Sequence, residues 1–136
     1  IGVAQFERLN VFVEAKRKIA KLYNATLNKY SFLQTPVEKR NFHNTYWLYT
    51  FLIEDEAPFS REELMGFLSQ KGIETRPVFY PLNIMPPYKH YGYKQNLLSS
   101  NEVSKKGISL PTSVNLSDLE VRFICDSINE FIKARI

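Results

Sequence analysis

The sequence predicts an α+β fold, in which a small three-stranded sheet is backed by helices. Helical periodicity of apolar residues marks both ends of the chain, and three short apolar runs between them are typical of strands. Two capping boxes mark helix starts, one in the middle of the chain and one at the beginning of the final helix. With 136 residues, of which 44% are hydrophobic and 24% charged, the chain suits a single domain, residues 1–136, with its own core.

The first element is a long amphipathic helix over residues 2–27. Its apolar positions recur near the helical period: Val3, Phe6, Leu9, Val13, Ala20, Tyr23 and Leu27. No capping residue precedes the pattern, so we expect the helix to continue from preceding sequence and the chain to be a fragment.

A strand is predicted over residues 42–53, where aromatic and β-branched residues dominate. Alternation places one set of side chains on each face: Tyr46, Leu48, Thr50 and Leu52 on one, and Trp47, Tyr49, Phe51 and Ile53 on the other. Both sets are largely apolar, so both faces are expected to be covered.

The middle of the chain reads as a helix followed by a second strand. Ser60 and Glu63 form a capping box, and an apolar stripe follows and ends at Gly72: Leu64, Phe67 and Leu68. Residues 73–80 then predict a strand in which Pro77 removes one ladder donor, which favours an edge position or a bulge.

The last third begins with a proline-rich segment, residues 81–96, predicted to be an ordered loop with a short helical turn. A brief helix near Ser100 and a third strand over residues 107–110 follow. Ser117 and Glu120 form the second capping box. The final helix carries an expected core stripe: Leu119, Phe123, Ile124, Ile128, Phe131 and Ile132.

Composition argues against several functional classes. The net charge of +4 comes from scattered residues, so the charge pattern points only weakly to nucleic acid. Cys125 is the single cysteine and cannot form an internal disulfide. No apolar run approaches the roughly 20 residues of a membrane span and no signal peptide is visible. These features favour a cytoplasmic location without membrane insertion.

Four stretches together resemble one family. They are IGVAQFERLN, YWLYTFLI, KGIETRPVFYPLNIMPPY and GISLPTSVNLS, and they resemble the C-terminal domain of the DegT/DnrJ/EryC1/StrS aminotransferases. The resemblance covers essentially the whole chain. Within the family, YWLY before GIETRPVFYPL is most similar to the perosamine synthase branch.

The resemblance implies the C-terminal small domain of a fold-type I, pyridoxal 5'-phosphate-dependent transferase with the aspartate-aminotransferase fold. Its members act on nucleotide-linked keto-sugars, usually with glutamate as amino donor, and are commonly homodimers. The perosamine branch implies GDP-4-keto-6-deoxymannose as substrate, for cell-surface polysaccharide biosynthesis.

The same resemblance implies that the cofactor is bound by a large N-terminal domain absent from this sequence, together with the lysine that forms the Schiff base. The lysines present here fit that expectation. Lys16, Lys18 and Lys21 lie on the polar side of a helix, and Lys105 and Lys106 lie near a turn, so all five are expected to be solvated. We therefore expect no catalytic or cofactor-binding residue here and an inactive fragment.

Arg76 is the strongest candidate for substrate binding, since its guanidinium could hold a carboxylate or phosphate by paired bonds. An edge-strand arginine in solvent or in an ion pair is the alternative interpretation. Tyr80, Asn83 and Tyr88 follow and could bind a sugar hydroxyl or phosphate, although the tyrosines could simply anchor the loop. Many relatives have histidine at position 83, where an amide cannot transfer protons.

Other reactive residues are expected to be ordinary. His43 and His90 lack companions for a metal site, and Cys125 suits a small buried hydrophobe. Two alternative functions remain open at this point. One is an RNA-binding sheet that displays Trp47, Tyr49 and Phe51, and the other is a dimerisation module.

Overall fold

A computed structural model describes residues 1–91 and 97–136, and it contains a four-stranded antiparallel sheet in the order β1-β2-β4-β3. The strands are β1 (Leu33–Gln34), β2 (Tyr49–Ile53), β3 (Arg76–Pro77) and β4 (Gly107–Leu110). β2 and β4 form the centre, with Tyr49 opposite Leu110 and Phe51 opposite Ile108. This confirms the α+β class predicted from the sequence.

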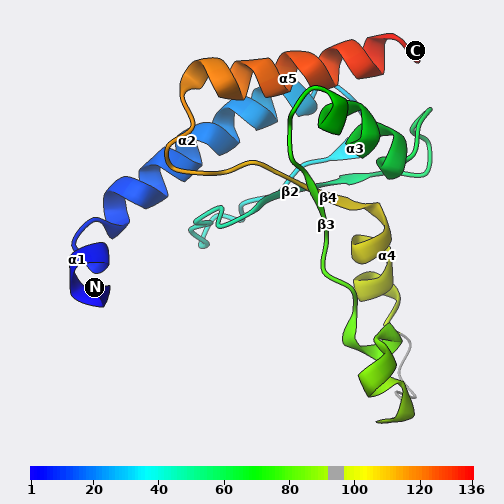
Figure 1. The fold of residues 1–136 in the computed structure, drawn as a ribbon, viewed down its shortest axis with the longest axis horizontal. Coiled ribbons are helices and arrows are strands. Elements are labelled where there is room, and N and C mark those ends of the chain that lie inside the picture. Colours follow the sequence, from blue (N-terminus) through cyan, green and yellow to red (C-terminus); the bar gives the residue numbers. More distant parts are fainter. Residues whose placement is uncertain (92–96) are drawn as a thin grey trace.

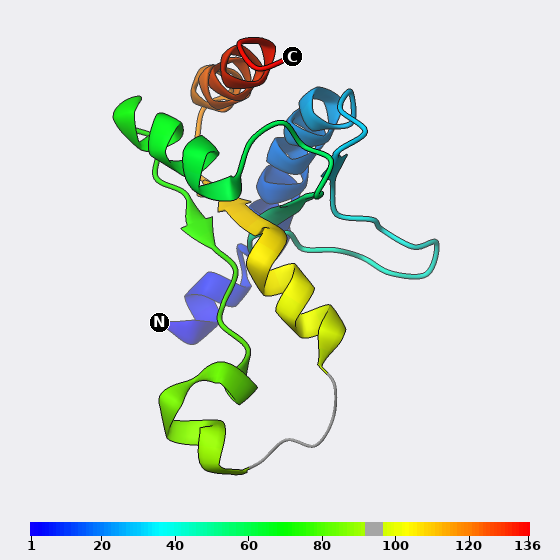
Figure 2. The ribbon, with the colours of Figure 1, turned by 90° about the vertical axis from the view of Figure 1, so that its right-hand side faces the viewer.

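The helices are α1 (Gly2–Phe6), α2 (Leu9–Leu27), α3 (Arg61–Gln70), α4 (Leu98–Lys106) and α5 (Asp118–Lys133). Two 3-10 turns, η1 (Leu82–Ile84) and η2 (Pro86–Tyr91), lie in the proline-rich segment. α2 and α5 lie side by side on one side of the sheet (Figure 1). η1 and η2 form a separate lobe at the opposite end of the molecule from α5 (Figure 2).

The core lies between the sheet and the three helices α2, α3 and α5. Tyr49 and Phe51 of β2 are completely buried, as are Tyr23 of α2 and Leu64 of α3. The α5 side chains that close this core are Val121, Ile124, Cys125, Ile128, Phe131 and Ile132. Burial of apolar area on this scale is the main force that holds the layers together.

The sheet differs from the expectation in two ways. It has four strands because Leu33 and Gln34 pair with Ile53 and Leu52, and two residues are too few to give a recognisable sequence pattern. The strand expected over residues 42–53 begins only at Tyr49, because Tyr46 has a φ of 48° and interrupts the extended backbone. The edge position predicted from Pro77 is confirmed, since β3 pairs with β4 alone.

The helices also depart from the expected pattern. The helix predicted over residues 2–27 divides at Arg8, and Val3, Phe6 and Leu9 are exposed rather than in the core. Leu119 and Phe123 of α5 are 78% and 52% exposed, so they lie outside the core stripe. The core face of α5 is instead completed by Val121, Cys125 and Ser127.

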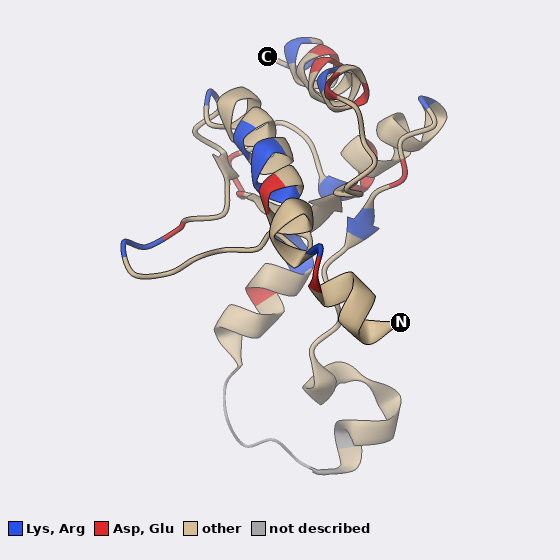
Figure 3. Ribbon diagram, turned by 90° about the vertical axis from the view of Figure 1, so that its left-hand side faces the viewer, with Lys and Arg blue, Asp and Glu red and all other residues tan. Residues whose placement is uncertain are grey.

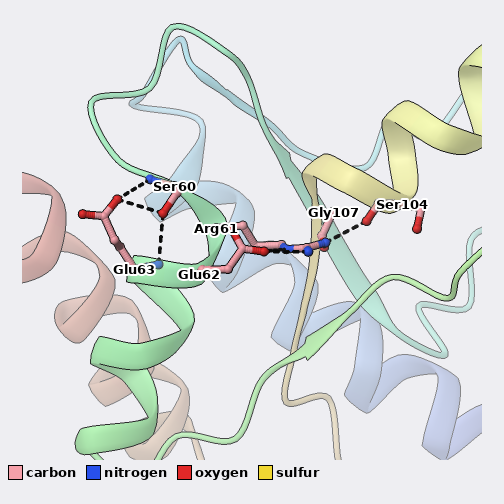
Figure 4. Close-up of polar contacts among 6 residues, drawn as sticks. All are labelled: Ser60, Arg61, Glu62, Glu63, Ser104 and Gly107. Atoms are coloured by element: carbon pink, nitrogen blue, oxygen red, sulfur yellow. Dashed lines mark hydrogen bonds and ion pairs between the residues drawn. The ribbon is translucent and has the colours of Figure 1, made fainter.

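Both predicted capping boxes are confirmed. Ser60 Oγ accepts from the Glu63 N–H, and the Glu63 carboxylate accepts from the Ser60 N–H at 2.7 Å (Figure 4). Ser117 and Glu120 repeat the arrangement at the start of α5, where the carboxylate accepts from the Ser117 N–H at 2.8 Å. Gly72, with a φ of 75°, ends the α3 segment as expected.

These boxes predict a loss of stability in acid. Hydrogen bonds from the Ser60 and Ser117 backbone N–H groups hold the pKa values of Glu63 and Glu120 below their usual range. A carboxylate with a depressed folded pKa contributes stability above its unfolded pKa, about 4.3, and loses that contribution as the pH falls through the folded value. We expect the urea midpoint of unfolding to fall between pH 5 and pH 3.

The matched variant is Glu63→Gln with Glu120→Gln, which keeps oxygen acceptors at both caps but removes the titration. This variant should have a smaller drop in urea midpoint between pH 5 and pH 3 than the unchanged chain. An identical drop would show that the caps do not contribute to the pH dependence.

Candidate functional site

Arg76 lies in a row of polar side chains that crosses three strands. In the sheet register Arg76 is opposite Ser109, and Ser109 is opposite Thr50. Residues directly opposite one another share a face of the sheet, so the row lies on the face away from the helical core. Thr50 Oγ1 and Ser109 Oγ are hydrogen-bonded at 2.8 Å, which leaves Arg76 as the charged end of the row.

Within the described part of the chain, the Arg76 guanidinium is hydrogen-bonded to a neighbouring side chain of its own segment. Its Nη2 and Nε donate to Glu74 Oε1 at 3.0 and 3.3 Å, and the Arg76 side chain is 76% exposed. An exposed ion pair of this kind contributes little stability, about 0–1 kcal/mol. An incoming anion could therefore replace Glu74 at low cost, although the pair also matches the alternative interpretation of Arg76.

Two hollows lie on either side of the segment that runs from Pro77 to Phe79. One is a cavity of 350 Å³, here called the outer cleft, and it is lined by Trp47, Leu48, Thr50, Arg76, Pro77, Val78, Phe79, Val103 and Ser109. The other has a volume of 420 Å³ and includes Tyr80, Leu82 and Met85 in its lining. The structure therefore places Arg76 and Tyr80 in neighbouring hollows rather than in one.

Asn83 and Tyr88 lie further along, on η1 and η2, and line neither hollow. Asn83 Oδ1 is buried and has no hydrogen-bond partner among the described residues. A buried acceptor without a donor is unfavourable by about 1–3 kcal/mol. Tyr88 is 40% exposed.

The charged side chains are unevenly distributed around this site. Figure 3 shows basic residues along α2 and on β3, whereas η1 carries no charged side chain. Among the described residues, Arg76 is the only charged side chain that lines the outer cleft. An anionic ligand in that cleft would have one cation to pair with.

Sequence reasoning missed two residues of the cleft, Trp47 and Phe79. Trp47 was expected on the covered face with Tyr49, but its ring is 70% exposed because the backbone turn at Tyr46 reverses the alternation. Phe79 is 72% exposed at the end of the edge segment. No feature of the sequence signals either exposure, because aromatic residues in a strand pattern favour burial.

The same burial values contradict the RNA-binding sheet. Tyr49 and Phe51, which would have to stack on bases, are completely buried against the helices. Trp47 alone of the three aromatic residues is available on the surface. A stacking platform for successive bases requires several exposed rings, so this interpretation is wrong.

Lys16 and Lys106 are half-buried, and protein oxygen atoms accept hydrogen bonds from their ammonium groups. This corrects the expectation that these two lysines are solvated. Lys16 Nζ donates to the carbonyls of Thr112 and Trp47 at 2.6 and 3.2 Å. Lys106 Nζ lies within 3.4 Å of Glu54, Asp55 and Glu102, and the hydrogen bonds that it donates to Asp55 and Glu54 raise its pKa. A lysine with a raised pKa is a poor nucleophile.

Lys106 also forms one wall of a 430 Å³ cavity that Glu54, Asp55 and Arg61 share. Its charges pair with one another. Arg61 binds Glu62 at 2.7 Å and donates to the Ser104 carbonyl at 2.7 Å (Figure 4). The arrangement therefore has the character of a structural ion cluster, which joins the start of α3 to the end of α4.

The remaining reactive groups are not arranged for catalysis in the described part of the chain. Cys125 is buried as expected, and burial raises the pKa of its thiol. Residues 1–91 and 97–136 contain no cluster of three or more histidine, cysteine or acidic residues that could hold a metal. None of the described helices is both long and apolar enough to cross a bilayer.

Comparison with solved structures defines the class of fold. An aminotransferase, TlmJ of Streptoalloteichus hindustanus, superposes with a TM-score of 0.85 at 23% identity, over 98% of this chain and 35% of that one. A sugar aminotransferase of Streptococcus pneumoniae, Spr1654 in its PLP form, gives 0.81 at 20% identity, over 99% and 35%. The chain thus has the fold of one part of an aminotransferase.

Comparison of sequences identifies the family. Residues 1–129 match the DegT/DnrJ/EryC1/StrS aminotransferase family, and the chain belongs to that family. GDP-perosamine synthase of Escherichia coli O157:H7 is 40% identical over 131 residues, which cover 96% of this chain and 34% of that protein. The chain therefore spans about a third of the length of this relative.

Proposed function

We propose that this chain is the C-terminal small domain of a pyridoxal 5'-phosphate-dependent aminotransferase that transfers an amino group from glutamate to a nucleotide-linked keto-deoxysugar. Membership of the sugar aminotransferase family and 40% identity to a GDP-perosamine synthase support this proposal and favour GDP-4-keto-6-deoxymannose as the acceptor. The active protein would be a homodimer.

The observation that carries a substrate-binding role is the placement of Arg76 at the cleft. Its guanidinium is exposed on an edge strand and is paired with the exposed carboxylate of Glu74. We assign Arg76 to an anionic group of the substrate, which it can hold by charge-assisted hydrogen bonds. Tyr80, Asn83 and Tyr88 would then contact the sugar or its phosphates from the lobe.

The described residues do not fit the covalent attachment of the cofactor. Lys16, Lys71 and Lys106, the half-buried lysines of the described part, are held by carbonyl or carboxylate oxygens. Pyridoxal phosphate, which supplies an electron sink for amino transfer, would therefore be bound by a part of the protein outside this sequence.

The test is Arg76→Met in the complete gene product. Removing one charge-assisted contact should raise the KM of one substrate about tenfold, because such a contact contributes about 1.5–3 kcal/mol. Steady-state kinetics with the keto-sugar and the amino donor varied in turn would show which substrate Arg76 holds. Arg122→Met, which changes an exposed arginine on α5, is the matched control and should leave both KM values unchanged.

Two results would contradict this role. Unchanged KM values would place Arg76 outside the substrate site. Unchanged kinetics combined with a different sedimentation coefficient would instead favour the dimerisation module, because Arg76 would then act at a subunit contact.

A further inference from the structure

We propose that the outer cleft is the seat of the nucleoside of a nucleoside diphosphate, with Trp47 as a stacking platform for the base and Arg76 on the diphosphate. This inference rests on the proposed function, because it names the part of the substrate that this chain would hold. Three features of the cleft support the inference. They are Trp47 on an anchored backbone, the row of polar side chains formed by Thr50, Ser109 and Arg76, and the exposed aromatic residue Phe79 in the lining.

The structure holds Trp47 in place while leaving its ring exposed. The Trp47 carbonyl accepts from Lys16 Nζ and from Thr112 Oγ1, both at 3.2 Å. The preceding residue, Tyr46, is buried with a left-handed φ of 48°, and its N–H donates to Asn44 Oδ1 at 2.8 Å. A non-glycine residue in this conformation is strained, and strain that surrounding contacts maintain is typical of functional segments.

A second set of contacts anchors the same loop. Arg17 Nη1 donates to the Asn44 carbonyl at 2.7 Å and to Glu38 Oε1 at 3.0 Å. Tyr46 stacks on Tyr49 with ring centroids 6.2 Å apart. These bonds order the backbone on both sides of a ring that is 70% exposed. An aromatic residue on an anchored backbone binds a base with less loss of conformational entropy than one on a free loop.

The floor and rim of the cleft suit the rest of a nucleotide. Thr50 and Ser109 provide two hydroxyl groups that can donate to or accept from a base edge or a ribose. Arg76, the next member of the same row, provides the one charged group that the described residues contribute to the lining, and its fork matches phosphate oxygens. A neutral apolar ligand would leave this row unused.

The size of the cleft sets which part of the ligand it holds. A volume of 350 Å³ lies near the lower end of small-molecule pockets, about 300–1,000 Å³. Phe79 lines the cleft together with Trp47, so aromatic surface is present on two segments. We assign the base and ribose to the cleft, and the sugar beyond the phosphates to the neighbouring hollow that contains Tyr80.

The experiment compares GDP with inorganic pyrophosphate as ligands of the complete gene product, by isothermal titration calorimetry. Trp47→Ala should weaken GDP binding about tenfold, within the range reported for loss of one base–aromatic stack, and should leave pyrophosphate binding unchanged. Trp47→Phe should restore most of the GDP affinity. Arg76→Met should weaken both ligands, because it acts on the phosphates.

A second variant, Phe79→Ala, alters another segment of the lining, outside the anchored loop, and should also weaken GDP alone. Equal weakening of GDP and pyrophosphate by Trp47→Ala, or no weakening, would overturn the proposal. So would a Trp47 ring that acrylamide cannot reach in the ligand-free protein, since another part of the protein would then cover the cleft.

Failure of this inference is distinct from failure of the proposed function. If amino transfer to the keto-sugar occurs but Trp47→Ala leaves its KM unchanged, the nucleoside lies elsewhere and the proposed function stands. If no amino transfer occurs while GDP still binds in a Trp47-dependent manner, the cleft is a nucleotide site of a protein with another activity.

Discussion

Phe131→Ala is expected to lower the free energy of unfolding by about 4 kcal/mol, within the usual range for loss of a buried phenylalanine. Phe131 is 1% exposed at the centre of an aromatic cluster on α5. Its ring meets Phe59 edge-on at 5.0 Å between centroids and Phe67 at 5.2 Å. Arg135 Cζ lies 3.6 Å from the ring centroid, so truncation would also remove a cation–π contact.

Urea unfolding followed by circular dichroism measures this loss. Phe123→Ala on the same helix is the matched control, because Phe123 is 52% exposed and contributes no ring contact among the described aromatic pairs. We expect the control to change the free energy of unfolding by less than about 1 kcal/mol. Similar losses in the two variants would contradict the assignment of Phe131 alone to the core.

Phe123 and Phe131 show what helical periodicity can and cannot predict about α5. Periodicity located α5 and its capping box correctly, but placed Phe123 and Phe131 in one stripe. A stripe drawn from apolar residues alone cannot distinguish an apolar residue on the core face from one on the exposed face of the helix. Val121 and Cys125 complete the buried face, although neither was in the predicted stripe.

The strand pattern failed at the point where function is proposed. Alternation requires an extended backbone, and the left-handed φ of Tyr46 breaks it one residue before Trp47. That conformation is maintained by Asn44 and by Arg17, which lies 29 residues earlier on α2. A tertiary contact of this kind has no local sequence signature, so the exposed Trp47 could not be predicted.

The candidate site was partly predictable. Arg76 was identified as a charged residue in an apolar strand, and its exposed position on the edge fits both the binding role and the alternative of an edge-strand ion pair. Its place in a row with Ser109 and Thr50 depends on the register of β3 and β4, which the sequence leaves undetermined. The burial of Lys106 likewise depends on acids about 50 residues away, Glu54 and Asp55.

Gly107→Ala is expected to lower the free energy of unfolding by about 3 kcal/mol, because the new methyl group has no space. A Cβ atom at this position would lie 2.3 Å from Val78 Cγ2 and 2.6 Å from the Val103 carbonyl oxygen. The backbone there is ordinary extended structure, with a φ of −82°, so the effect is steric.

The contacts around Gly107 leave the backbone little freedom to move away from the new methyl group's neighbours. Arg61 Nη1 donates to the Ser104 carbonyl at 2.7 Å and lies 3.5 Å from the Gly107 carbonyl oxygen (Figure 4). The Val78 N–H also donates to the Gly107 carbonyl, at 3.3 Å. A shift that accommodates the methyl group must therefore move Val78, which lies between Arg76 and Tyr80 in the candidate site.

Urea unfolding of a control and of a double variant measures these effects. The double variant separates the clash with Val78 from the clash with the Val103 carbonyl oxygen. Gly66→Ala has no atom within 4 Å of its new Cβ and should stabilise α3 by about 0.5–1 kcal/mol, since alanine is the better helix former. Gly107→Ala should be less destabilising in a Val78→Ala background, where the closest atom is gone and the carbonyl contact remains. If Gly107→Ala lowers the free energy of unfolding equally in both backgrounds, Val78 is not the neighbour that resists the methyl group. The packing of Gly107 in β4 would then not be coupled energetically to the side chain of Val78.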